Sequence, residues 1–357
     1  MQPQIIFKVT KILSISLFVI VFLNEAFSAP TKAKDPPGGA LAGDRMRVII
    51  GTDAGRGDHD DEQSLVHFLL YADLFDIEGF IATTGNGGTG KTSAILEVID
   101  AYSGDYDKLK TYSSNYPSPA YLKSVVVMGE SVKAPSAGYK KPTAGSELII
   151  KAAKKNDPRP LYICFWGGVT DLAQAVHDDP SIKSKIRGLA IGSVRQDRNA
   201  GKYLINNHKD LWLVRMEDSN KGMWYGGYQS GNYSNGNFAE IHIKGHGVLG
   251  SYYWNIKKED GTYPRRIREG DTSSFLYLLR GDPNHPTKEH WGGRFQKSAT
   301  KQWVDRQELQ YSKKSADGKT WYGLETVSKW RVNFLDEYEK RMDRAKQKNP
   351  NSTKDPR

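Results

Sequence analysis

The chain has 357 residues, of which 38% are apolar, 26% charged and 11% aromatic. This length and composition exclude a disordered chain and are sufficient for one large domain or two small ones. A single cysteine, Cys164, excludes an internal disulfide framework and a zinc site built from several cysteines. The formal net charge of +10 is spread along the sequence, which indicates a weak preference for anionic partners and no nucleic-acid partner.

The N-terminal segment has the pattern of a secretory signal. Basic residues precede an apolar run over 12–23, and Ala26 and Ser28 supply the small side chains of a cleavage site. A membrane-spanning helix needs about 20 apolar residues. The shorter run therefore favours a cleaved leader over 1–28, with an uncleaved anchor as the alternative. We expect a secreted or periplasmic protein that has no membrane contact after cleavage.

Composition also indicates the limits of the folded part. Residues 29–43 are rich in proline, glycine and alanine, and we expect a flexible lead-in. Residues 344–357 are polar and basic, and we expect a disordered tail. The intervening residues 44–343 are predicted to form one domain.

Strand and helix patterns alternate from the start of this domain. In chain order we expect a strand over 46–50, a helix over 62–75, a strand over 77–84, helices over 93–102 and 146–155, a strand over 161–166, a helix beginning at 171, and strands over 186–193 and 211–216. This alternation predicts an α/β fold with an open, mainly parallel sheet and helices on both faces. Ligands bind such sheets beyond the carboxyl ends of the strands, so the loops there are the candidate site.

The loop after the first strand concentrates carboxylates between Asp53 and Glu62. Like charges this close repel one another and need a cation, raised pKa values or exposure to water. Oxygen ligands without cysteine or clustered histidine favour Ca²⁺ or Mg²⁺ over zinc. The alternative is that Asp60 or Asp61 caps a helix that begins near Glu62, and that the other carboxylates are solvated.

Asp53, a glycine-containing loop and the pair Asp60-Asp61 before an apolar helix resemble the metal signature of the nucleoside hydrolases. The longer segments EVIDAY, GSELIIKAAKKNDPRPLYICFWGGVTDLAQAV, EGDTSSFLYLL and WGGRF are similar to the secreted nucleoside hydrolase-like domain of proteins described as cellulose-binding. This likeness extends from about Arg47 to about Met342. It implies the nucleoside hydrolase-like version of the predicted sheet.

The resemblance also implies a metal centre with one Ca²⁺. The carboxylates of Asp53, Asp61 and Asp271 and the main-chain carbonyl of Thr170 would be its ligands. Asp53 would in addition accept the proton of a water bound to the metal, which the metal makes more acidic.

Substrate contacts follow from the same resemblance. Asp60 and Asn86 would bind the sugar. The family's sugar-binding segment has no clean match in SVRQDRNAGKYLINN, and Asn199, which lies in the corresponding region, is the candidate there. The chain also departs from the nucleoside hydrolases, because Gly51 stands where they have an acidic residue. In addition, no histidine directly precedes Asp271 to protonate a leaving base. The candidates for that proton are His59, His246 and His290, and the alternative for each is a surface or packing residue.

These features predict an exported hydrolase of glycosyl bonds, with N-ribosyl compounds as the first candidate substrates. The partner would be a small sugar or nucleoside, or a polysaccharide. Two alternatives remain open at this point: a carbohydrate-binding protein without catalysis, and a hydrolase of O-glycosides derived from a polysaccharide.

Two further segments have other interpretations. Residues 85–92, GNGGTGKT, fit the phosphate-loop pattern and would place Lys91 on the phosphates of a nucleotide. Export away from nucleoside triphosphates argues against that function, and glycine-rich turns also arise for backbone reasons alone. Residues 222–238 combine aromatic, asparagine and glycine residues, which suits either stacking on sugar rings or ordinary loop packing.

Overall fold

The computed structural model describes residues 30–55, 59–85, 88–258 and 260–346. Residues 1–31 and 32–357 are distinguished as two units, and all elements below belong to the second. The predicted leader over 1–28 lies outside the described residues. Within the part that is described, no helix has both the length and the apolar character needed to cross a bilayer.

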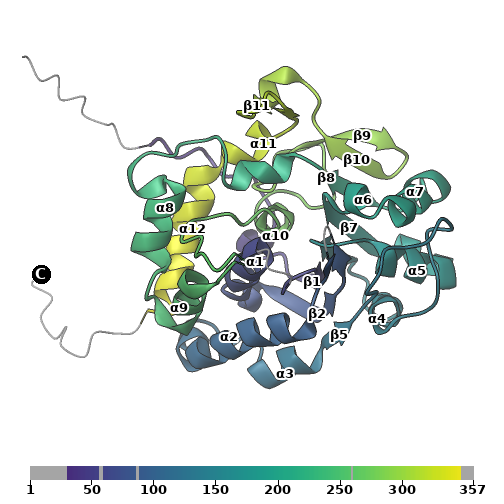
Figure 1. Cartoon of the computed structure of the whole chain (residues 1–357), viewed down its shortest axis with the longest axis horizontal. Coiled ribbons are helices and arrows are strands. Elements are labelled where there is room, and N and C mark those ends of the chain that lie inside the picture. The colour runs from purple at the N-terminus through teal and green to yellow at the C-terminus, as the bar shows by residue number, and fades with distance from the viewer. Residues whose placement is uncertain (1–29, 56–58, 86–87, 259, 347–357) are drawn as a thin grey trace, which may run out of the picture. The chain divides into compact units, whose positions relative to one another are not determined.

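The core of the domain is a sheet of eight strands, counted over the described residues (Figure 1). Its order is β5-β2-β1-β6-β7-β8-β10-β9, and every neighbouring pair is parallel except β10 with β9. The strands are β1 (Met46–Thr52), β2 (Phe75–Ala82), β5 (Val126–Met128), β6 (Leu161–Phe165), β7 (Ile186–Ile191), β8 (Leu213–Met216), β9 (Phe295–Ala299) and β10 (Gln302–Asp305). The mainly parallel sheet predicted from the sequence is confirmed.

Helices cover both faces of this sheet, as Figure 1 shows. One core joins α1 (His59–Leu69), α2 (Thr92–Tyr112), α9 (Gly247–Asn255), α10 (Thr272–Leu279) and α12 (Arg331–Asp343). The second core joins α4 (Ala144–Ala153), α5 (Thr170–Asp178) and α7 (Arg198–Asn207). Along β1, Val48 and Ile50 enter the first core and Ile49 the second, because successive side chains of a strand point to opposite faces.

Short elements complete the domain. The remaining strands are β3 (Thr84–Gly85), β4 (Gly88–Thr89), β11 (Lys313–Lys314) and β12 (Thr320–Trp321). The remaining α-helices are α3 (Pro119–Ser124), α6 (Ser193–Gln196), α8 (Asn235–Phe238) and α11 (Glu325–Ser328). Single turns of 3₁₀-helix occur at Ala40–Ala42, Ala72–Leu74, Pro180–Ser184, Ser219–Met223, Gly231–Tyr233 and Leu309–Tyr311, and a π-helix at Ala239–Ile243.

The order of the strands creates a switch point beside β1. The chain proceeds from β1 to β2 and β5 on one side, and then returns to form β6 on the other side of β1. The two strands pair in parallel from Arg47 with Leu161 to Gly51 with Phe165, so their carboxyl ends lie side by side. In open α/β sheets the crevice at such a point is the usual binding site.

Predicted and observed boundaries differ at the first two helices. The second, α2, continues to Tyr112, ten residues beyond its predicted end at residue 102. The sequence predicts a helix over 62–75, whereas α1 spans His59–Leu69 and β2 already begins at Phe75. The reason is that Phe75 pairs with Met46 in the sheet, and this pairing takes precedence over the helical periodicity.

The expected lead-in and tail make defined contacts within the domain. Asp35 accepts hydrogen bonds from the indole of Trp291 at 3.0 Å and from the amide of Asn333 at 2.5 Å, and Ala40 is buried. Ala345, in the expected tail, is fully buried as well. Ordered packing therefore extends into both of these segments.

Candidate functional site

The end of β1 positions the first carboxylates of the site. Asp53 follows the last residue of the strand and is 0% exposed. The hydroxyl of Thr52 donates a hydrogen bond to Oδ1 of Asp61 at 2.5 Å, which holds the start of α1 against the strand. The same hydroxyl accepts a hydrogen bond from the N–H of Ala54 at 3.1 Å.

Helix α1 carries three acidic residues in its first turn, Asp60, Asp61 and Glu62. Asp61 and Glu62 are buried, and Glu62 accepts a hydrogen bond from the N–H of Gly55 at 2.8 Å. The interpretation of Asp60 or Asp61 as a cap with solvated neighbours is therefore wrong. The helix begins at His59, so both aspartates lie inside its first turn, where the partial positive charge of the helix end favours carboxylates.

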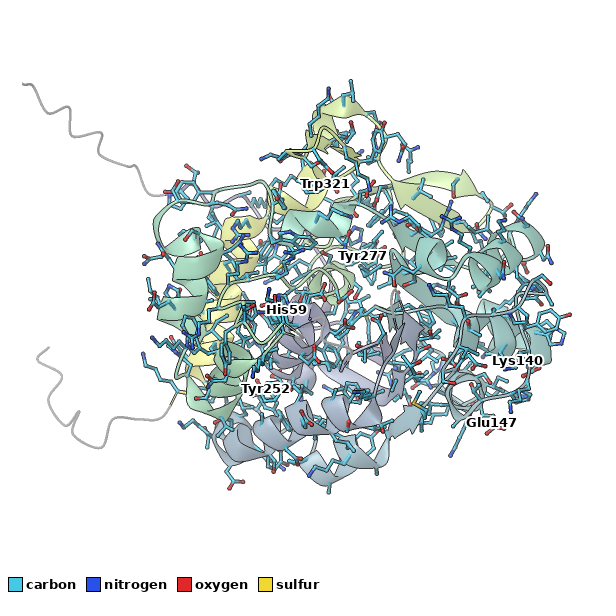
Figure 2. All side chains as sticks on the ribbon, viewed as in Figure 1. His59, Lys140, Glu147, Tyr252, Tyr277 and Trp321 are labelled. Atoms are coloured by element: carbon cyan, nitrogen blue, oxygen red, sulfur yellow. The ribbon has the colours of Figure 1, made fainter. Side chains whose placement is uncertain are left out.

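A third segment brings Asp271 to the same place. It precedes α10 and is 5% exposed. Carboxylate oxygens of Asp60, Asp61 and Asp271 lie within 4.8 Å of one another. Two segments far apart in the chain thus form one acidic cluster beyond the carboxyl end of β1, next to His59, which is labelled in Figure 2.

The cluster has strong electrostatic consequences for Asp61. Burial raises the pKa of Asp61 well above its usual value, and the neighbouring carboxylates of Asp53, Asp271 and Asp60 raise that pKa further, in this order. Without a cation, the Asp61 carboxyl therefore favours a bound proton. A divalent cation would offset both effects, and a set of carboxylate oxygens suits a hard ion such as Ca²⁺ or Mg²⁺.

The loop after β6 forms the opposite side of the switch point. An added Cβ at Gly167 would lie 3.1 Å from Cβ of Asp53, so this loop packs directly on Asp53. Thr170 follows at the start of α5, and its hydroxyl donates a hydrogen bond to the carboxylate of Asp197. Thr170 therefore lies at the expected edge of the sheet, and metal binding by its carbonyl stays a prediction.

The predicted substrate contacts have different outcomes. Asp60 is half-buried at the cluster, whereas Asn86 lies outside the described residues. The side-chain amide of Asn199, in α7, donates a hydrogen bond to the carbonyl of Ala134 at 2.9 Å. This bond ties Asn199 to the loop before α4, and its contact with a sugar stays a prediction.

Three histidines were candidates for proton donation. His246 pairs with Asp343 at 3.3 Å. His290 stacks on Tyr277 at 4.0 Å between ring centroids, and burial lowers its pKa to about 4. Of the three, His59 is the one in the same helical turn as the acidic cluster.

The described residues of the glycine-rich segment, 85 and 88–92, show a contact with Asp53 that the sequence analysis did not predict. The two short strands β3 and β4 pair as an antiparallel hairpin. The N–H groups of Gly90 and Lys91 donate to main-chain carbonyls, each at 2.8 Å, whereas a phosphate loop points its amides at the ligand. An added Cβ at Gly85 would lie 1.4 Å from Oδ2 of Asp53. Absence of a side chain at Gly85 is what allows the carboxylate of Asp53 to occupy its position.

A cavity of about 1330 Å³ lies at the other end of the strands. Met46, at the amino end of β1, and Pro160, just before β6, are among its lining residues. It is therefore separated from Asp53 by the length of β1 and does not belong to the acidic cluster.

Comparisons with known proteins identify relatives of this chain. Residues 47–295 match the family model described as the nucleoside hydrolase-like domain of cellulose-binding Sde182. A solved structure of a nucleoside hydrolase-related hypothetical protein from Saccharophagus degradans, described as associated with carbohydrate metabolism, is 32% identical. That match covers 86% of this chain and 73% of the other, with a TM-score of 0.66.

More distant structures also match. A plant nucleoside hydrolase is 15% identical over 84% of this chain and 99% of its own, with a TM-score of 0.46. The inosine-uridine preferring nucleoside hydrolase from Bacillus anthracis is 14% identical over the same shares, 84% and 99%, with a TM-score of 0.45. No curated protein matches the chain.

Proposed function

Because the chain belongs to the Sde182 nucleoside hydrolase-like family, we propose that it is an exported, metal-dependent hydrolase of glycosyl bonds. N-ribosyl compounds are the first candidate substrates. One observation carries the proposal: carboxylate oxygens of Asp60, Asp61 and Asp271 lie within 4.8 Å of one another, beyond the end of the strand that positions Asp53. Such a cluster, buried at a switch point of the sheet, suits a cation and a polar ligand.

Ca²⁺ is the metal that we assign to this cluster. The donors would be the carboxylates of Asp53, Asp61 and Asp271 and the carbonyl of Thr170. When bound, Ca²⁺ supplies the positive charge that keeps these carboxylates ionised, and it holds oxygen atoms of water and of a sugar diol. The raised pKa of Asp61 supports this fit, because the buried carboxylates need a compensating charge.

Asp53 is the proposed general base. Its side chain is enclosed between Gly85 and Gly167, which restricts where the carboxylate can point. In that position Asp53 would accept a proton from the attacking water. Asp60 is more exposed and would accept hydrogen bonds from sugar hydroxyls. The negative charge of the cluster would stabilise the oxocarbenium-like state that forms as the glycosidic bond breaks.

A direct test uses the purified chain without residues 1–28. Inosine, uridine and aryl glycosides would be incubated with the protein in CaCl₂ or in excess chelator, and released sugar would be measured. We expect turnover of at least one nucleoside in CaCl₂, and its loss in chelator and in Asp53→Asn. Turnover that is insensitive to chelator would contradict the proposed mechanism.

A second function is favoured by the description of the family as cellulose-binding. In that case the same acidic cluster would hold a sugar diol without hydrolysis. Cellulose pull-down and turnover assays on one preparation separate the two functions: binding with no product from any glycoside supports the second. Product from aryl O-glycosides but not from nucleosides would instead indicate a hydrolase of polysaccharide fragments.

Export is the remaining part of the proposal, and it rests on the leader-like sequence of residues 1–28. Expression of the full chain in a secreting host, followed by N-terminal sequencing, would test it. A mature protein that starts at residue 29 is the expected result, and an intact N-terminus in the cytoplasm would contradict it.

A further inference from the structure

A cavity of about 600 Å³ lies close to the acidic cluster and has a different chemistry. Trp224 and Tyr225, from the segment after β8, and Trp321, from β12, form its aromatic part. The rings of Tyr225 and Trp321 meet edge to face, with centroids 4.6 Å apart. Trp321, labelled in Figure 2, belongs to the antiparallel pair of β11 and β12. The volume is in the range of sites that bind small molecules.

The rest of the lining is strongly basic. It includes Lys221, Arg266, Arg268 and Lys313, and none of the described residues that line the cavity is acidic. Lys221 already pairs with Asp218 at 3.2 Å. Over the described part of the chain, the other three cations make no ion pair with a carboxylate within 4.0 Å. Among the described residues, the positive charge of these three side chains therefore has no carboxylate partner, and the guanidinium of Arg268 lies over the Trp224 ring at 5.6 Å.

Backbone contacts hold this basic wall in place. The side-chain amide of Gln63 donates to the carbonyl of Arg266 at 3.0 Å, and its oxygen accepts from the N–H of Arg268 at 3.1 Å. Between them Ile267 is buried, and its N–H donates to the carbonyl of Asn235 at 3.0 Å. The two arginines thus extend from a segment that is fixed from both sides.

The same contacts connect the basic cavity to the acidic cluster. Gln63 lies one turn after Asp60 on α1, so a single helix supports both sites. An added Cβ at Gly270 would lie 2.9 Å from the Trp224 ring, and Gly270 directly precedes Asp271. Trp224 therefore packs on the segment that carries a predicted metal ligand, which places the aromatic part of the cavity beside the acidic cluster.

We propose that this cavity binds an anionic group of a glycosyl ligand, a phosphate or a carboxylate attached to a sugar. Arginine side chains bind both groups through paired hydrogen bonds, and Lys313 adds a point charge. The aromatic rings would stack on the attached sugar or base. This inference deepens the proposed function. It rests on that function in one respect, the assumption that the ligand is a glycosyl compound.

Calorimetric titration of the mature protein in excess chelator tests binding apart from catalysis. The probes are ribose 5-phosphate with ribose, and galacturonic acid with galactose. We expect at least one anionic probe to bind at least 10-fold more tightly than its neutral partner, and this preference to weaken as salt is added. The probe that binds more tightly identifies phosphate or carboxylate as the preferred group. Equal affinity within both pairs would overturn the inference.

Two adjacent lysines offer a matched control. Lys313 lines the cavity, whereas its neighbour Lys314 on β11 does not. Lys313→Ala and Arg268→Gln should each weaken binding of the anionic probe at least 3-fold, and Lys314→Ala should leave it unchanged. An equal loss in Lys314→Ala would show diffuse charge attraction and would overturn the site. Circular dichroism of each variant establishes that it is folded.

The outcome is separable from that of the proposed hydrolase. Asp61→Asn should abolish turnover but retain the preference for the anionic probe in chelator. If the protein prefers anionic probes but turns over no glycoside, the hydrolase proposal is contradicted and the anion site is supported. If the protein turns over nucleosides but shows no preference for anionic probes, the hydrolase proposal is supported and the anion site is contradicted.

Discussion

Gly85 lies against the carboxylate of Asp53, so closely that an added Cβ at Gly85 would come within 1.4 Å of Oδ2. Asp53 directly follows β1, and Gly85 belongs to β3, so the contact forms only once these two segments meet in the folded domain. The proposed base is therefore positioned by the absence of a side chain on its neighbour.

Replacement of Gly85 by alanine should displace the Asp53 carboxylate. We expect activity to fall by about 100-fold, because a shift of about 1 Å at a reacting group has an effect of that size. The free energy of unfolding should fall by about 1–3 kcal/mol through overpacking. Steady-state kinetics and denaturant unfolding measure the two effects. Gly236→Ala is the matched control, because no atom lies within 4 Å of its added Cβ. Wild-type activity in Gly85→Ala would show that Asp53 does not need this position.

Substitution of Asp61 by asparagine should separate stability from metal binding. In chelator, Asp61→Asn should be at least as stable as the wild type, because it removes one of several buried like charges. In CaCl₂ at about 100 times the dissociation constant, the wild type should gain about 2.7 kcal/mol and the variant much less. Thermal melts with and without Ca²⁺ measure this. Asp107→Asn on the exposed face of α2 is the control. Equal Ca²⁺ stabilisation of both proteins would exclude Asp61 as a ligand.

The raised pKa of Asp61 predicts an unusual dependence of stability on pH in the metal-free protein. The folded state holds this proton more tightly than the unfolded state does. The contribution of Asp61 is therefore fully present below its unfolded pKa and is lost as pH rises through its higher folded pKa. Relative to Asp61→Asn, the wild type should lose stability as pH rises from about 4. Urea unfolding of both proteins in chelator over this range tests the sign, and a difference that does not change with pH would contradict the pKa shift.

A buried ion pair at the amino end of β1 should affect stability without affecting the site. Arg47 contacts Glu78 at 2.8 Å, and both side chains are buried. Arg47→Met should lower the free energy of unfolding by about 3 kcal/mol, because it leaves Glu78 with fewer charge partners. Lys123→Met, which breaks the exposed pair with Asp100, should cost less than about 1 kcal/mol. Denaturant unfolding measures both variants. Calcium affinity should be unchanged in each, and a change in Arg47→Met would show that the two ends of β1 are coupled.

The sequence by itself determined most strands of the central sheet. It also determined which chemical groups the loop after the first strand carries. Alternating patterns predicted β1, β2, β6, β7 and β8, because each strand is a short apolar run bounded by turn residues. The density of carboxylates between Asp53 and Glu62 indicated a cation site. The addition of Asp271 depended on the family resemblance, since no local pattern connects it with that loop.

Only the tertiary structure decided which residues meet. The 4.8 Å cluster of Asp60, Asp61 and Asp271 exists because the return of the chain places α10 beside α1. The contact of Gly85 with Asp53 and the basic aromatic cavity beside Gly270 depend in the same way on the order of strands and on the packing of segments far apart in the chain. Periodicity reports the local conformation of a segment, whereas these contacts are set by packing between segments that are distant in the sequence.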